Sequence, residues 1–216
     1  FGTMSFISLF SAAGLLGMLY VFPLMYQEVL NHSALDTALI TFPEALGLML
    51  ASQLMPRLFA KLGLRRLISA ALLCGAVMFA LLSLTGPGAN PWFLRGLLFL
   101  AGFFLGQAVG AVQIASFANI SSASMGRATT LFHVQNRLGS ALGVAVMSCL
   151  LAVMSQHTED LQPDLSAYRM ALLGAAGFLA AALCFALRIR DADAAPGMGT
   201  HSRSETRKAR AEGSGR

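Results

Sequence analysis

Six apolar runs of roughly 20 residues or more follow one another along the chain, and they restrict its possible folds more than any other feature. An α-helix rises about 1.5 Å per residue, so a run of this length spans a hydrocarbon core about 30 Å thick. Only 12% of the 216 residues are charged, whereas soluble domains use about 25%, and the mean hydropathy is +0.67. The sequence therefore predicts an all-α membrane protein in which six transmembrane helices form a bundle.

Polar and turn-forming clusters separate the apolar runs and set the expected helix ends. Ser33 followed by Asp36 forms a capping box at the start of the second run, and the loop at 83–92 closes on an interfacial Trp92. Residues 190–216 are rich in Gly, Ser and Arg and are expected to form a disordered basic tail. The bundle at 1–189 is expected to contain helices at about 4–26, 34–56, 66–84, 92–117, 128–154 and 168–188.

The basic residues are divided unevenly between the two sides of the predicted membrane. All but two of the 15 Lys and Arg residues fall in the second and fourth connections, near the start of the fifth helix, at the end of the last helix or in the tail. Arg95 and Arg169 lie on the other side, together with acidic residues such as Glu28 and Asp164. Because cytoplasmic segments are enriched in Lys and Arg, we expect a multi-pass protein of the inner (plasma) membrane with both termini in the cytoplasm.

The side chains that usually carry catalysis or metal binding form no recognisable motif in this sequence. Cys74, Cys149 and Cys184 fall inside apolar helices, at spacings typical of neither a metal site nor a disulfide framework. The histidines have no ligand partner at a useful spacing, and there is no nucleophile–base pair or phosphate-binding loop. The net charge of +5 comes from the loops and the tail and indicates membrane topology. We therefore expect no enzyme activity, metal ion, cofactor or nucleic-acid partner.

A proline and a glutamate interrupt the second apolar run, in the segment ITFPEALGL. Glu44 lies about ten residues past the start of this helix and hence roughly 15 Å deep. Its short side chain cannot reach water from that depth, so the carboxyl should be protonated, paired or in contact with a water-filled space. Two roles are open: a proton-coupling or cavity-lining group, and a permanently protonated group that hydrogen-bonds to a neighbouring helix. Pro43 bends the helix beside it, which suits a gating helix but also occurs in ordinary membrane helices.

The fourth helix contains three glycines at four-residue spacing, Gly102, Gly106 and Gly110. Glycines at this spacing form a groove on one helical face that lets another backbone approach closely. The groove favours either simple helix–helix packing or a smooth contact along which a mobile helix slides. Arg137, about ten residues into the fifth helix, also has two interpretations. It is either an anchor at the cytoplasmic interface or a gate that pairs with a carboxylate on a partner segment.

Taken together, the six segments resemble the C-terminal six-helix half of a major facilitator superfamily transporter. More narrowly, they resemble the fourteen-helix drug:proton antiporter group (the EmrB/QacA type). The first helix and its loop are similar to a recurring Tyr, Pro, Tyr, Gln pattern of that group, on Tyr20, Pro23, Tyr26 and Gln27. The fifth helix is similar to the group's Gly-x-Ala and Gly-x-x-x-Gly-x-Ala runs, on Gly126, Ala128, Gly139, Gly143 and Ala145.

The basic loop after the second helix departs from the loop motif shared across the superfamily. Ala60 stands where that motif has an Asp. The basic and glycine positions are kept, on Lys61, Gly63, Arg65 and Arg66. The resemblance therefore implies that the superfamily's charged latch is stronger in the other half of the molecule. The basic residues of this loop are then candidates for a gate or a cytoplasmic anchor.

The resemblance also implies a function. It implies one half of an exporter of hydrophobic or cationic small molecules, driven by the proton gradient and working by alternating access with an N-terminal half or a second bundle. The first and fourth helices would line the cavity, with Tyr20, Gln107 and Gln113 as candidate substrate contacts. The second and fifth helices would face the other bundle, so the partner of Glu44 would lie outside this chain. The alternative is a non-transporting membrane interaction or assembly module built on the same half-transporter bundle.

Overall fold

A computed structural model describes residues 2–86, 88–117, 125–155 and 165–188, and the predicted tail at 190–216 lies outside them. Within these ranges the chain forms six α-helices and one π-helix and no strand. In chain order the elements are α1 (Gly2–Leu24), η1 (Met25–Val29), α2 (Ala34–Leu62), α3 (Leu64–Ser83), α4 (Pro91–Phe117), α5 (Met125–Ser155) and α6 (Leu165–Leu187).

All six α-helices are long and apolar enough to cross a membrane. Their candidate spans run from 20 residues in α3 to 30 residues in α5. At about 1.5 Å per residue, even the shortest matches the roughly 30 Å of a hydrocarbon core. The prediction of an all-α fold with six transmembrane helices is therefore confirmed for the described residues.

Different residues determine where α2 begins and where it ends. At the start, the Ser33 hydroxyl oxygen accepts a hydrogen bond from the Asp36 backbone N–H at 3.1 Å. At the other end the helix continues past Pro56 to Leu62, whereas the sequence pattern placed its end at residue 56. The proline removes one backbone donor without stopping the helix. Gly63 then ends it with a φ of 75°, a conformation that glycine adopts without strain.

The C-terminal end of α1 widens into the π-helix η1. The N–H of Leu30 donates to the carbonyl of Met25, and the N–H of His32 donates to that of Tyr26, both at 3.3 Å. Asn31 follows with a φ of 52°, in the left-handed region that asparagine tolerates better than most residues. The chain reverses there and enters α2.

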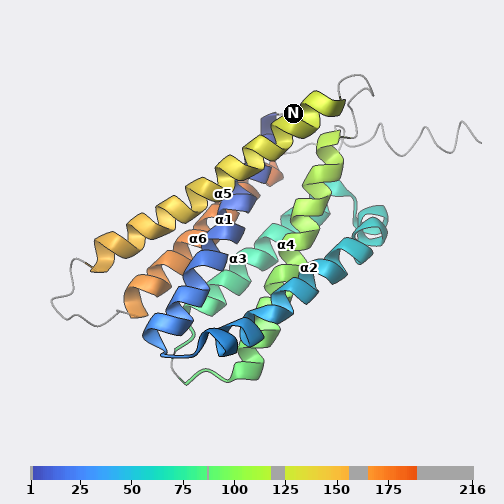
Figure 1. The fold of residues 1–216 in the computed structure, drawn as a ribbon. Helices are drawn as coiled ribbons and strands as arrows, with labels where there is room; N and C mark the ends of the chain where they lie inside the picture. The colour runs from blue at the N-terminus through green and yellow to red at the C-terminus, as the bar shows by residue number, and fades with distance from the viewer. Residues whose placement is uncertain (1, 87, 118–124, 156–164, 189–216) are drawn as a thin grey trace, which may run out of the picture.

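The two central helices of the bundle are α1 and α4 (Figure 1). Helix α5 packs against α1, and α2 packs against α4, so that α5, α1, α4 and α2 form a row, with α3 and α6 behind it. The outer helices of this row are the least covered. The apolar spans of α2 and α5 are 28% and 17% buried, against 56% and 50% for α1 and α4. The row therefore presents two helices with broad uncovered faces.

The core lies where α1, α3, α4 and α6 meet. Its largest side chains are fully buried and come from all four helices: Phe22, Phe79, Leu98, Leu105 and Leu172. In a lipid environment, close van der Waals packing and interhelical hydrogen bonds hold such helices together, because lipid tails are as apolar as leucine. This core keeps α1 and α4 in place as the supports on which α5 and α2 rest.

Candidate functional site

The carboxyl group of Glu44 is buried between α2 and α4. The residue is 2% exposed, and neither carboxyl oxygen has a hydrogen-bond partner among the described residues. No group of three or more His, Cys, Asp and Glu side chains able to hold a metal ion occurs in the same ranges. A buried carboxylate without a partner is strongly unfavourable, so ionisation of this group requires that water or a cationic partner reach it.

Helices α2 and α4 approach each other at backbone distance, and glycines on both helices make this possible. A methyl group added to Gly102 would collide with the carbonyl oxygen of Glu44, and one added to Gly106 would lie 2.6 Å from Cβ of Ala51. From the other side, a methyl group on Gly47 would collide with the backbone of α4 at Phe99. The groove formed by the α4 glycines is thus filled by α2, with Glu44 at its outer end.

Gln107 belongs to the same helix contact. It is 1% exposed, and its Nε2 donates a hydrogen bond to the carbonyl of Ala51 at 3.0 Å. Its Oε1 has no partner within the described part of the chain. Gln107 therefore lies between two packed helices and hydrogen-bonds across them, and its contact with a substrate in the complete transporter stays a prediction.

The other two cavity candidates are exposed but far apart. Tyr20 is 36% exposed and lies four residues before the end of α1, at the end of the bundle where α2 begins. Gln113 is also exposed, but it lies four residues before the end of α4, where that helix reaches the opposite side. The structure does not bring Tyr20, Gln107 and Gln113 together in one site.

Helices α1 and α5 make a second glycine contact, on the other side of the row. Methyl groups on Gly139 and Gly143 would collide with the α1 backbone at Leu9 and Ala13. Closer to the start of α1, the Ser5 hydroxyl donates to Oε1 of Gln135 at 2.6 Å. Two of the glycines by which the sequence resembles the antiporter group, Gly139 and Gly143, therefore bring α5 onto α1.

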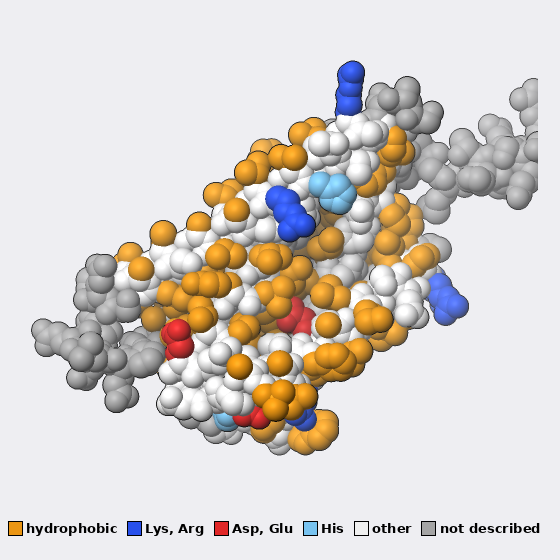
Figure 2. Space-filling model, viewed as in Figure 1, with side chains coloured by type: hydrophobic (Ala, Val, Ile, Leu, Met, Phe, Trp, Pro, Cys, Tyr) orange, Lys and Arg blue, Asp and Glu red, His pale blue; other side chains and the backbone are white. Residues whose placement is uncertain are grey.

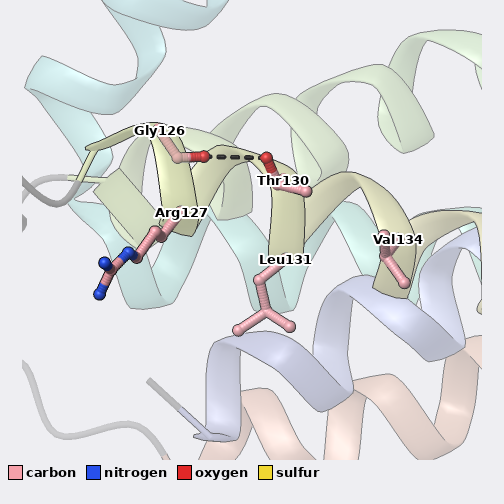
Figure 3. A pocket seen from close by; sticks show the side chains of 5 residues that line it. All are labelled: Gly126, Arg127, Thr130, Leu131 and Val134. Atoms are coloured by element: carbon pink, nitrogen blue, oxygen red, sulfur yellow. Dashed lines mark hydrogen bonds between the residues drawn. The ribbon is translucent and has the colours of Figure 1, made fainter.

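Arg137 lies on the uncovered face of α5, away from this contact. With His133, Val134 and Leu138 it lines a shallow depression of about 360 Å³. A second depression of about 430 Å³ continues toward the start of α5 (Figure 3). Its lining residues lie on the same helix: Gly126, Arg127, Thr130, Leu131 and Val134.

The surface around these depressions is mostly hydrophobic. Figure 2 shows basic and histidine side chains toward the upper end of α5, on a face that is otherwise largely apolar. The exposed apolar residues of α5 include Leu131, Leu138 and Leu142. Arg137 therefore stands on an open helix face, and no acidic side chain among the described residues lines its depression to neutralise it.

The basic residues around Gly63, where α2 ends and α3 begins, are tied to the end of α6 through Arg65. Nη2 of Arg65 donates a hydrogen bond to the carbonyl of Leu187 at 3.0 Å. The last carbonyls of a helix lack intrahelical donors and carry partial negative charge, so a guanidinium stabilises them. Lys61 and Arg66 are exposed in the same loop region.

The opposite end of the bundle has its own ties, which the sequence does not indicate. The Tyr168 hydroxyl of α6 donates to the Glu28 carboxylate in η1. Nη2 of Arg169 donates to the carbonyl of Thr85, after the end of α3, at 3.3 Å. These bonds join segments that are 140 and 84 residues apart in the chain, and no local pattern predicts them.

Two residues that matter for the site escape prediction from the sequence, for different reasons. Gly47 lies one turn after Glu44, and its spacing from Pro43 and Glu44 suggests no groove by itself. His133 has no ligand partner in the sequence pattern, yet it lines the same depression as Arg137. Its four-residue spacing from Arg137 places both on one helix face and is the signal that could have found it.

Comparisons with known proteins assign the chain to a protein family. Residues 2–144 match the family described as Major Facilitator Superfamily. A multidrug resistance protein B homolog of Mycobacterium tuberculosis (strain ATCC 25618 / H37Rv) is 26% identical over 160 residues, which cover 73% of this chain and 29% of that protein. The puromycin resistance protein pur8 of Streptomyces alboniger is 29% identical over 140 residues, which cover 62% of this chain and 28% of that protein.

This chain spans less than a third of the length of the relatives it matches. The matched family covers the chain from the start of α1 into α5, which includes both glycine contacts and Glu44. With its six membrane-spanning helices, the chain belongs to the major facilitator superfamily, a transporter family whose members related to this chain include drug-resistance proteins.

Proposed function

We propose that these six helices form the C-terminal half of a proton-coupled exporter of hydrophobic or cationic small molecules. They would work by alternating access together with a second six-helix bundle. Membership of the transporter family and the resistance proteins among the relatives support this proposal. The observation that carries it is the buried and unpartnered carboxyl of Glu44 in an otherwise apolar helix contact of the described chain.

The carboxyl of Glu44 would bind and release the coupling proton. While α2 and α4 are closed over it, the neutral form is favoured because no donor or cation of the described residues compensates a charge there. A rearrangement that lets water reach the carboxyl would permit ionisation and release the proton on that side of the membrane. Since the charged form opposes closure, proton binding and helix closure would favour each other, as coupled equilibria must.

The second bundle would rest against the open faces of α2 and α5. Those helices have the least buried spans, and their exposed residues include Phe42 and Met49 on α2 and Leu138 on α5. His133 and Arg137 would then meet acidic or hydrogen-bonding groups of that bundle near its cytoplasmic end. This placement leaves α1 and α4 at the centre, where their exposed side chains would border the substrate path.

Proton coupling is tested by transport into vesicles that contain the purified full-length transporter. We expect a lipophilic cationic dye to accumulate when a pH gradient is imposed, and accumulation to stop when the gradient is collapsed by a proton-exchanging ionophore. The experiment compares the initial rate of dye uptake with and without the gradient, with protein-free vesicles as the control. Equal rates in the two conditions would refute coupling to protons.

We further propose that the chain lies in the inner membrane with the loop between α2 and α3 in the cytoplasm. Lys61 and Trp92 are exposed at opposite ends of the bundle and serve as matched reporters. In a protein whose native cysteines are replaced by alanine, a membrane-impermeant maleimide should label Trp92→Cys in intact cells. Lys61→Cys should react only after the cells are opened. The reverse pattern of labelling would contradict this orientation.

A further inference from the structure

The closest approach of α4 to Glu44 is made by one glycine. A methyl group on Gly102 would collide with the carbonyl oxygen of Glu44 and would lie 3.0 Å from its Cγ. The neighbouring glycines of the groove face different parts of α2. Gly106 lies opposite Leu48 and Ala51, and Gly110 lies opposite the side chain of Met55. Gly102 is therefore the groove glycine whose lack of a side chain bears directly on Glu44.

This contact also contributes to the burial of Glu44. Glu44 is 2% exposed although the span of α2 is only 28% buried, and Gly102 of α4 lies directly against its carbonyl and its Cγ. Phe42 and Leu46, which flank it on α2, are 59% and 43% exposed. A small increase in the separation between α2 and α4 at this level would open the carboxyl to its surroundings.

No charged group of the described chain compensates Glu44 in the closed arrangement. On α4 the nearest ionisable residue in the chain is Arg95, seven residues before Gly102, and it lies 4.8 Å from the ring centre of Trp92. None of the titratable groups on α2 or on the elements packed against it forms a hydrogen bond with the carboxyl of Glu44 in the described ranges. These groups are Tyr26, Glu28, Asp36, Arg57, Lys61, Arg65, Arg66, Cys74 and Arg95.

We propose that Gly102 is a positioning residue for Glu44: its missing side chain lets α4 close directly over this carboxyl and keeps it from water until the two helices separate. The proposal rests on the proposed function, to which it adds the element that controls access to the proton site. Gln107 holds the same pair one to two turns further along, through its hydrogen bond to Ala51. The groove thus has a sensitive end at Gly102 and a tolerant end at Gly110, where the opposing atom is the flexible end of Met55.

The test uses dicyclohexylcarbodiimide, an apolar reagent that adds to a protonated carboxyl while the carboxyl proton passes to a reagent nitrogen. The full-length transporter in membranes is treated over a range of pH values, and modification of Glu44 is measured by mass spectrometry after detergent extraction and size-exclusion chromatography. Only the monodisperse fraction is analysed. We expect strong modification of Glu44 in the unaltered protein and no modification at that position in Glu44→Gln.

Gly102→Ala should change the pH profile of this modification. The added methyl group forces α2 away from α4 at Glu44 and admits water, which favours the ionised, unreactive form. At pH values above the midpoint of the profile, modification should therefore fall about tenfold, the change expected for a downward shift of one pH unit. Gly110→Ala adds the same methyl group to the same groove, 3.1 Å from Cε of Met55, and should leave the profile unchanged.

Gly47→Ala tests the same contact between α2 and α4 by a substitution on α2. Its methyl group would collide with the α4 backbone at Phe99 one turn away, and it should move the profile in the same direction as Gly102→Ala. An unchanged profile in Gly102→Ala would overturn the positioning role, as would an equal change in Gly110→Ala. If Gly102→Ala and Gly47→Ala both yield no monodisperse protein, the contact serves assembly and the proposal also fails.

These outcomes are separate from those of the proposed function, because the modification needs no transport. Glu44→Gln that leaves proton-driven efflux intact would refute coupling at Glu44, whatever the carbodiimide shows. If Glu44→Gln loses efflux as expected but Gly102→Ala has an unchanged profile, the coupling role of Glu44 stands and the positioning role of Gly102 is refuted.

Discussion

Glu44→Gln in the full-length transporter should reduce proton-driven efflux to the level of cells that lack the protein. Glutamine fills nearly the same volume and resembles the protonated carboxyl, so the contact between α2 and α4 should persist. The glutamine amide cannot ionise, so it has no proton to release when the two helices separate. The measurement is the initial rate of dye efflux from energised cells at several external pH values, corrected for the amount of protein in the membrane.

Substrate exchange separates this effect from loss of folding. Exchange of labelled for unlabelled substrate in de-energised vesicles requires the helices to move but requires no net proton release, so Glu44→Gln should retain it. Asp36→Asn is the matched control, because it removes one carboxylate from an exposed position on the same helix. Efflux by Glu44→Gln with an unaltered pH dependence would show that Glu44 is a structural carboxyl.

Gly143→Ala should destabilise the bundle, although replacing glycine by alanine inside a helix usually increases stability. In a helix interior, alanine is favoured over glycine by about 1 kcal/mol. At Gly143, however, the methyl group would collide with the carbonyl oxygen of Ala13 in α1, a backbone atom that cannot rotate away. Overpacking of this kind costs about 1–3 kcal/mol. We expect a net loss of stability and weakened packing of α5 on α1.

Gly177→Ala is the matched control for this prediction. A methyl group there meets nothing within 4 Å, so only the gain in helix propensity should remain. Thermal unfolding of the detergent-purified protein, followed by the loss of the monodisperse fraction, should give a lower midpoint for Gly143→Ala and an equal or higher midpoint for Gly177→Ala. The same shift in both variants would mean that the close approach of α1 and α5 does not limit stability.

The number and type of the helices could be predicted because a bilayer imposes a minimum apolar length on every span. Each of the six runs forms one helix, and all expected ends but one lie within three residues of the observed ones. The larger difference, at Pro56, has a local cause. A proline lacks the N–H donor for one hydrogen bond of its own helix, and this loss is tolerated where the other hydrogen bonds of the turn remain.

The surroundings of Glu44 could not be predicted in the same way. Its depth follows from counting residues, but the direction in which its side chain points depends on the rotation of α2 about its own axis. That rotation is set by the fit of Gly47 and Gly102 to the opposite backbones, which is a relation between distant segments. The family resemblance implied a partner for Glu44 outside this chain; in the structure Glu44 packs against α4, and its carboxyl has no partner among the described residues.

The π-helix at the C-terminal end of α1 has a consequence for how related chains are aligned. A turn of this kind accommodates one more residue than an α-turn, and each added residue rotates the next part of a helix by about 100°. The bond between Glu28 and Tyr168 therefore depends on the length of the segment Met25–Val29 as well as on its side chains. A homologue with one residue fewer there would carry its acidic group on a different side of the helix and lack this tie. A single-residue gap at this point would then be a true structural difference between family members.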